Sequence, residues 1–265
     1  MLLDFKHLGA LRWLLSGFGA LVCAFLLCPI VFIVLLSFGS SRWLAFPPPS
    51  WTLRWYQEFL SDGQWLSSLA TSAEIATAVA ILSVVLGLLA SFALVRGQFA
   101  GLTSLRAFLI MPMIMPVVIL AIGLYGIYLR ANLNGTFIGF VLAHLVVALP
   151  FSVIVISNSL AAFDKSHEDA AIICGASPWR ARLQVTIPSI RLGLIAAAIF
   201  SFLISWDEVV IAIFMSSPHL QTFPVRIWTM LRQDLTPVIA AASTLLIALT
   251  TGLLLLVHWL QRNRV

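Results

Sequence analysis

The sequence predicts an all-α, polytopic membrane protein with six transmembrane helices and both termini in the cytoplasm. Of its 265 residues, 61% are hydrophobic and only 9% are charged, whereas charged residues make up about 25% of an ordinary soluble domain. A soluble fold needs a polar exterior that this composition does not supply. Six apolar windows also reach the length of about 20 residues that a membrane-spanning helix requires, namely 13–38, 66–95, 107–129, 133–162, 192–217 and 235–260.

The first window is expected to be a retained span. It follows Lys6 and Arg12 and so superficially resembles a signal peptide. Its uncharged run from Trp13 to Ser41 is far longer than the apolar core of a signal peptide, and it ends without a small-residue cleavage site. The alternating ten-residue pattern of an outer-membrane β-barrel is missing, which favours helices. We therefore expect one transmembrane domain over residues 1–265.

The segment after the first window predicts an exterior loop at the membrane surface. Tryptophan and tyrosine are typical of the membrane–water interface, and proline prevents a helix from continuing. This segment contains both kinds of residue, namely Trp43, Pro47, Pro48, Pro49, Trp51, Trp55 and Tyr56.

Prolines also fall inside two later windows, Pro112 and Pro116 in the third and Pro150 in the fourth. Each removes a backbone donor and bends its helix. Two interpretations remain open, a kink required by packing or a helix that lines a translocation path.

Lysine and arginine are distributed unevenly between the two sets of loops. One set and the termini contain Lys6, Arg12, Arg96, Arg106, Lys165, Arg180, Arg182, Arg191, Arg262 and Arg264, whereas the other loops contain Arg42, Arg54, Arg130, Arg226 and Arg232. The excess places the first set, with both termini, in the cytoplasm. The formal charge of +5 is therefore interpreted as membrane orientation. Nucleic acid is not expected as a partner, because no basic patch with interleaved aromatic residues is present.

The loop between the fourth and fifth windows carries the local signals of a short helix. Ser166 is expected to cap this helix, and Glu168 and Asp169 in its first turn suit the helix dipole. Gly175 is expected to end it, and Pro178 to begin the next turn. The outer face of such a helix has nothing in this chain to pack against, so the pattern predicts a docking element.

This loop resembles the signature of binding-protein-dependent ABC importer permeases, which reads E-A-A, three residues, Gly, nine residues, I-x-L-P. Here Asp169-Ala170-Ala171 is followed at the same spacing by Gly175 and then by Val185-Thr186-Ile187-Pro188. Asp169 replaces the usual glutamate, but Glu168 stands beside it, and Val185 and Ile187 keep the apolar character of the motif. The chain is accordingly identified as a member of this family by resemblance.

The resemblance implies a coupling segment at 163–188 that fits a groove on an ATP-binding subunit. By position, the residues that couple to the ATPase would be Glu168, Asp169, Ala170, Ala171, Gly175 and Pro188. The implied partners are a dimer of ATP-binding subunits, a second, homologous permease and a periplasmic solute-binding protein, in the lipid of a bacterial inner membrane. The chain has no G-x-x-x-x-G-K-[ST] motif. We therefore expect a transport subunit that is not an enzyme and binds no cofactor, with ATP and Mg²⁺ on the ATPase.

The fifth window contains the candidate residues of the solute pathway, Trp206, Asp207 and Glu208. Ionisable groups inside a span are costly and usually face a bundle interior or a water-filled cavity. In a continuous helix starting near residue 190, Asp207 would lie about 25 Å along the axis, where a carboxylate would suit a cationic solute. The alternative, which remains open, is a helix-end charge at the outer interface or a structural hydrogen-bond partner to a neighbouring span.

The same stretch, with the exterior loop Leu220-Gln221-Thr222-Phe223-Pro224-Val225 and Pro237, resembles the second permease of spermidine/putrescine-type importers. This similarity extends over nearly the whole chain. It implies that the solute is a polyamine or a related amine or amino-acid-like compound. His144 in the fourth window is interpreted as a buried core residue, because no Cys, Asp or Glu spaced like a metal partner accompanies it.

Two other functional classes fit the sequence less well. An ion-coupled secondary transporter acting without an ATPase predicts inverted repeats with paired broken helices, and no such internal symmetry is visible. A membrane enzyme requires a nucleophile–base constellation or a metal set, whereas the histidines are scattered at positions 7, 144, 167, 219 and 258.

Overall fold

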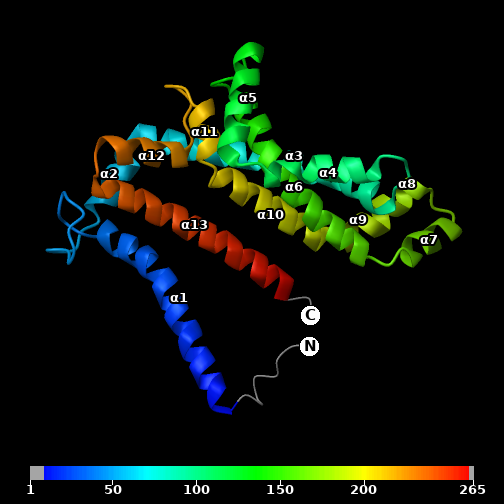
Figure 1. Ribbon diagram of the computed structural model, residues 1–265, viewed down its shortest axis with the longest axis horizontal. Helices are drawn as coiled ribbons and strands as arrows, with labels where there is room; N and C mark the ends of the chain where they lie inside the picture. The colour runs from blue at the N-terminus through cyan, green and yellow to red at the C-terminus, as the bar shows by residue number, and fades with distance from the viewer. Residues whose placement is uncertain (1–8, 263–265) are drawn as a thin grey trace. The chain divides into compact units, whose positions relative to one another are not determined.

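Helices form the regular secondary structure of residues 9–262, the part of the chain that the computed structural model describes (Figure 1). The all-α class is thus confirmed. The elements are α1 (Gly9–Ser37), α2 (Arg54–Ser61), α3 (Gly63–Arg96), α4 (Leu102–Ile114), α5 (Val117–Ala131), α6 (Phe137–Ala162), α7 (Ser166–Ile173), α8 (Pro178–Ala181), the π-helix η2 (Arg182–Thr186), α9 (Ile187–Ser189), α10 (Arg191–Trp206), α11 (Val210–Met215), α12 (Phe223–Gln233) and α13 (Pro237–Arg262).

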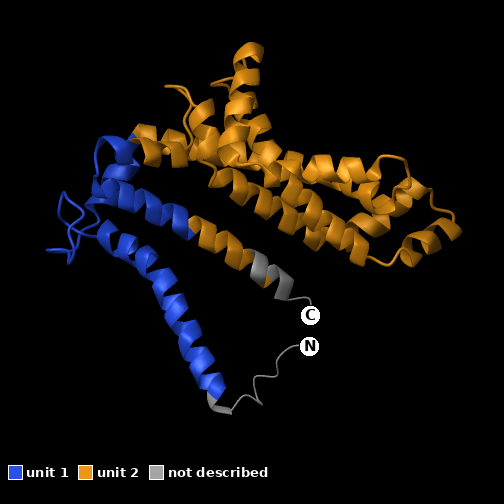
Figure 2. Cartoon of the chain, in the orientation of Figure 1, with its two compact units in different colours: residues 1–62, 230–248 blue, residues 63–229, 249–265 orange. Residues whose placement is uncertain are grey.

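The chain divides into two units (Figure 2). One contains residues 1–62 and 230–248, and the other contains residues 63–229 and 249–265. α12 and α13 each begin in one unit and end in the other.

In the first unit, the loop after α1 folds back on the end of that helix. Ser37 Oγ and Tyr56 Oη lie 2.6 Å apart, and the Trp55 indole donates a hydrogen bond to the carbonyl of Gly39. α1 itself is apolar, and its side chains are exposed from Leu11 to Ile33, as expected for a helix that meets lipid or another subunit. The predicted stop after the first span is confirmed.

The second unit is built around α3, α6 and α10, which lie side by side (Figure 1). Small residues let α3 and α6 approach closely, as is typical of helix packing in membranes. Ser152 Oγ donates to the carbonyl of Ser83 at 2.8 Å, and Ser91 Oγ donates to the carbonyl of Val153 at 3.2 Å. A Cβ atom on Gly87 would lie 2.6 Å from Ser152 Oγ, so a larger residue would push the two helices apart.

The predicted third span, 107–129, is broken. α4 and α5 are separated at Met115 and Pro116, and their axes differ by 105°, so α5 turns away from the line of α4 and packs beside α11 (Figure 1). Met115 is extended, with ψ of 136°, the conformation that a following proline favours. Pro112 and Pro150, in contrast, lie inside α4 and α6 without ending them.

The predicted fifth span, 192–217, is also not one helix. α10 ends at Trp206 and α11 begins only at Val210, so the expectation of a continuous helix through Asp207 is wrong. The segment Pro178–Ser189 meets α10 at 69°. The remaining windows agree with observed helices within four residues, 13–38 with α1, 66–95 with α3, 133–162 with α6 and 235–260 with α13.

Within the described part of the chain, four helices are long and apolar enough to cross a membrane, or up to six if each bent pair is one span. The predicted orientation rests in part on Lys6 and Arg264, which lie outside the described residues. The cytoplasmic location of both termini stays a prediction.

Candidate functional site

The coupling segment begins with α7, whose first turn is capped from upstream. Oδ1 of Asp164 accepts a hydrogen bond from the backbone N–H of Ser166 at 2.9 Å. This bond, together with the Ser166 hydroxyl, lowers the pKa of the Asp164 carboxyl from its ordinary value. The expectation that Ser166 supplies the cap is therefore wrong. Asp164 lies two residues earlier, where its carboxylate reaches a free N–H of the first turn.

Gly175 ends α7 as predicted. Its φ of 97° is left-handed, a conformation that glycine adopts without penalty. The N–H of Gly175 bonds to the carbonyl of Ile172 at 2.9 Å, and the N–H of Ala176 bonds to the carbonyl of Ala171 at 3.0 Å. This pair of bonds is a Schellman motif, which satisfies the last carbonyls of a helix.

The chain then returns toward the membrane through three short helical pieces. Ser177 Oγ accepts from the N–H of Arg180 at 3.3 Å and caps α8, in which Pro178 is the first residue. The π-helix η2 follows, and Pro188 lies exposed in α9, three residues before α10 starts. The predicted position of Pro188 at the entry to the fifth span is confirmed.

Glu168 is turned inward. It is 5% exposed, and its carboxylate accepts from Thr186 Oγ1 at 2.8 Å and from Arg182 Nε at 3.4 Å. Glu168 therefore does not lie on the outer docking surface where the sequence interpretation placed it. Its neighbour Asp169 does face outward, with 54% of the side chain exposed and the Lys165 ammonium 4.0 Å away.

The outer surface of the segment is more apolar than the sequence interpretation expected. Ala170 is exposed and Ala171 is half-buried, while Ile173 is 86% exposed and Trp179 is 62% exposed. The interpretation missed these last two residues. They could have been identified from the sequence because they are large apolar residues in a loop predicted to lie in water. Clusters of such residues mark contact surfaces.

The two candidate acids of the fifth span lie within the break between α10 and α11. Asp207 follows the last residue of α10 and is exposed. Glu208 is half-buried, and its Oε1 accepts from the N–H of Ile211 at 2.8 Å, which stabilises the first turn of α11. Glu208 is thus a charge at a helix end rather than a hydrogen-bond partner to a neighbouring span, and of the two acids Asp207 presents the open carboxylate.

Trp206, the third candidate, lies inside the protein, with 1% of its surface exposed. Its ring stacks on Phe202 at 5.6 Å and lies 6.3 Å from the ring of Phe223. Beside it, Nδ1 of the fully buried His144 lies 2.9 Å from Ser205 Oγ, which joins α6 to α10. His144 is thus the buried core residue that the sequence predicts, and Trp206 packs the end of α10.

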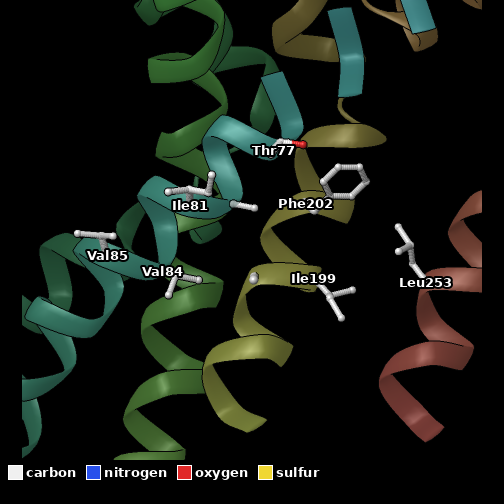
Figure 3. Close-up of a pocket in the computed structure, with 9 residues that line it drawn as sticks. Thr77, Ile81, Val84, Val85, Ile199, Phe202 and Leu253 are labelled. Atoms are coloured by element: carbon white, nitrogen blue, oxygen red, sulfur yellow. The ribbon is translucent and has the colours of Figure 1, made fainter. Parts of the chain in front are cut away.

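A separate cavity of 450 Å³ opens between α3, α10 and the end of α13 (Figure 3). It is lined by Thr77, Ala80, Ile81, Val84, Val85, Ala198, Ile199, Phe202 and Leu253. None of the candidate acids lines it. Such a surface suits apolar groups and offers nothing to pair with a charged solute.

The coupling segment and the break at Asp207 lie at opposite ends of α10. This helix has 16 residues, so the two sites are about 24 Å apart along its axis. One rigid element therefore joins the candidate docking surface to the candidate pathway.

The chain is similar to known transport proteins. The model of the family described as "Binding-protein-dependent transport system inner membrane component" matches residues 97–264. The "Putrescine transport system permease protein PotI" of Escherichia coli K12 is 32% identical over 253 residues, which cover 93% of this chain and 88% of that protein. The "Spermidine/putrescine transport system permease protein PotC" of Haemophilus influenzae is 28% identical over 95% of this chain and 97% of its own length.

Solved structures show the same fold. One is described as a bacterial ABC transporter involved in the import of the acidic polysaccharide alginate. A chain of it superposes with a TM-score of 0.70 at 15% identity, covering 100% of this chain and 98% of that one. A second, a bacterial alginate ABC transporter in complex with a pentasaccharide-bound periplasmic protein, also gives a TM-score of 0.70, at 12% identity over 98% of this chain and 96% of that one.

Proposed function

Because the chain belongs to the binding-protein-dependent transport system inner membrane component family and is a permease subunit of an ABC importer, we propose that it forms half of a polyamine pathway. The solute would be putrescine, spermidine or a related amine, delivered by a periplasmic binding protein. The permease is a transport subunit and not an enzyme. An ion-coupled transporter working without an ATPase is not favoured for a member of this family.

The proposal that the coupling segment binds an ATPase subunit is supported by the exposed face of this segment. Asp169, Ala170, Ile173 and Trp179 offer one carboxylate and an apolar surface on the same short stretch of chain. Apolar side chains left in water favour burial in a partner. The partner would be one subunit of an ATP-binding dimer, which carries ATP and Mg²⁺, while a second, homologous permease supplies the other half of the pathway.

The solute class is supported by two observations. Relatives named for putrescine and for spermidine/putrescine align with 93% and 95% of this chain. In addition, the open carboxylate of Asp207 lies at a helix break in a predicted span, where irregular backbone is expected to line a cavity. A carboxylate favours an ammonium group over a neutral or anionic solute.

The test is reconstitution of the complete importer. The permease, its partner permease, the ATPase and the binding protein would be assembled in proteoliposomes, and uptake of labelled putrescine would be measured. We expect uptake that needs both ATP and the binding protein and that unlabelled spermidine inhibits. Uptake without ATP would contradict the importer assignment, and ATP-driven uptake of another solute that neither polyamine inhibits would contradict the solute class.

A further inference from the structure

We propose that Glu168 is a positioning residue that fastens the coupling helix α7 to the helices behind it, so that movement of α7 reaches α3 and α10. The inference rests on the proposed docking of this segment to an ATPase. It assigns to Glu168 a task different from docking, and this task follows from the contacts of its carboxylate.

The first step is the burial of a charged group. Glu168 is 5% exposed, and removing a carboxylate from water is costly unless partners compensate it. Two partners are present, the Thr186 hydroxyl at 2.8 Å and the Arg182 guanidinium at 3.4 Å. Both lie more than a dozen residues along the chain, so these bonds hold two separate pieces of the loop together.

The second step concerns where those partners lie. Arg182 and Thr186 are the first and last residues of the π-helix η2, and Thr186 is fully buried. A π-helix is rare and often occurs at a functional position. Here it leads through α9 directly into α10. Movement of the Glu168 carboxylate would therefore be passed through η2 and α9 to the first turn of the predicted membrane helix α10.

The third step extends the contacts to a second membrane helix. The guanidinium carbon of Arg182 lies 5.6 Å from the ring centre of Phe92 in α3, a cation–π distance. Arg96 of α3 also donates to the carbonyl of Phe163, just after α6, at 3.5 Å. Glu168, Arg182 and Phe92 therefore form a continuous series of side-chain contacts from α7 to α3.

The two adjacent acids of the motif thus have different tasks. Successive residues point about 100° apart on a helix, and here Asp169 faces outward with 54% of its side chain exposed while Glu168 faces inward. Asp169 is suited to contact the ATPase, and Glu168 to transmit its movement. Loss of the Asp169 carboxylate should weaken binding of the ATPase subunit. Loss of the Glu168 carboxylate should leave that binding intact, but ATP would be hydrolysed with less solute transported.

The experiment compares Glu168→Ala, Glu168→Gln and Asp169→Asn in the reconstituted importer. The readouts are ATPase subunit retained on purification and solute moved per ATP hydrolysed. We expect Glu168→Ala to retain the ATPase but to lower solute moved per ATP by about tenfold, a coupling change near the upper range for single residues. Glu168→Gln, which keeps an acceptor for Thr186, should recover part of this loss, and Asp169→Asn should reduce retention.

A double-mutant cycle of Glu168→Leu with Thr186→Val covers the case in which Glu168→Ala does not fold, because leucine keeps a side chain of similar size and removes the acceptor for Thr186. Residues joined by a direct bond give non-additive effects, so the double variant should lose little more coupling than either single one. Additive losses in the cycle, normal coupling in Glu168→Ala, or loss of the ATPase from folded Glu168→Ala would each overturn the inference. If the wild-type complex retained no ATPase, the docking proposal itself would fail, which is a separate and recognisable result.

Discussion

At the scale of single residues, Asp207 and Glu208 show how neighbouring acids differ in availability. Asp207 is exposed after the last turn of α10, whereas Glu208 is half-buried and accepts from the N–H of Ile211 at 2.8 Å. A carboxylate that already satisfies a helix end is less free to pair with a solute. Asp207 is therefore the better candidate for contact with an ammonium group.

This difference predicts unequal effects of neutral substitutions. Asp207→Asn removes an exposed charge, whose pairing with a cation is worth up to about 1 kcal/mol, or roughly a fivefold change in affinity. We expect the apparent KM for putrescine to rise by about that factor. Glu208→Gln keeps an acceptor for Ile211 and should change KM less. Uptake kinetics in proteoliposomes give both values, and an equal KM in Asp207→Asn and wild type would remove this carboxylate from the pathway.

At the scale of helices, the coupling segment is shaped by how its short helices end. Gly175 ends α7 with a φ of 97°, and apart from its two chain neighbours no heavy atom of the described residues lies within 4 Å of the position of a Cβ. A side chain there would therefore meet no steric obstacle and would suffer only the backbone penalty of the left-handed region. Gly101, at the start of α4, has the same properties, with a φ of 98° and open space around it.

These two glycines form a matched pair for a test of docking. Valine in the left-handed region costs roughly 1–2 kcal/mol, so Gly175→Val should distort the end of α7 and lower ATPase retention by about tenfold. Gly175→Asn should be milder, because asparagine tolerates this conformation. Gly101→Val carries the same strain outside the coupling segment and should assemble normally. Equal losses at both glycines would show that general destabilisation, not docking, is responsible.

Helix positions followed from the sequence where length and apolarity alone decide them. The windows for α1, α3, α6 and α13 agree with the structure because lipid requires about 20 apolar residues to span it. The breaks could not be derived in the same way. Pro112 and Pro150 stay inside helices while Pro116 separates two, and no proline or glycine marks the end of α10 at Trp206. Neighbouring helices decide whether freed carbonyls are satisfied, and the local sequence does not contain that information.

In the candidate site too, features set by the local sequence were predictable and features set by remote contacts were not. Gly175 and Pro188 were predictable because a left-handed cap and a helix start are local features. The inward turn of Glu168 was not, since it depends on Thr186 and Arg182, which are remote in the sequence. The exposure of Ile173 likewise depends on what covers the segment in three dimensions.

At the scale of the whole molecule, the helical units have to be oriented in a membrane, and the native thiols offer a direct way to do it. The chain contains three cysteines. Cys23 and Cys28 lie in the apolar helix α1, and Cys174 lies exposed beside Gly175 in the coupling segment. A thiol reacts as its thiolate, which forms readily in water and poorly in hydrocarbon. Cys174 is therefore the natural reporter of the side on which the coupling segment lies.

We expect a membrane-impermeant maleimide to label the permease in inside-out vesicles and to leave it unlabelled in right-side-out vesicles. Cys174→Ser should abolish this labelling, and the double variant Cys23→Ser, Cys28→Ser should retain it. Addition of the ATPase subunit should slow the reaction, because docking would cover the residue beside Gly175. Labelling from the outer face would reverse the predicted orientation. Labelling from the inner face at an unchanged rate with the ATPase bound would keep the orientation but exclude Cys174 from the docking surface.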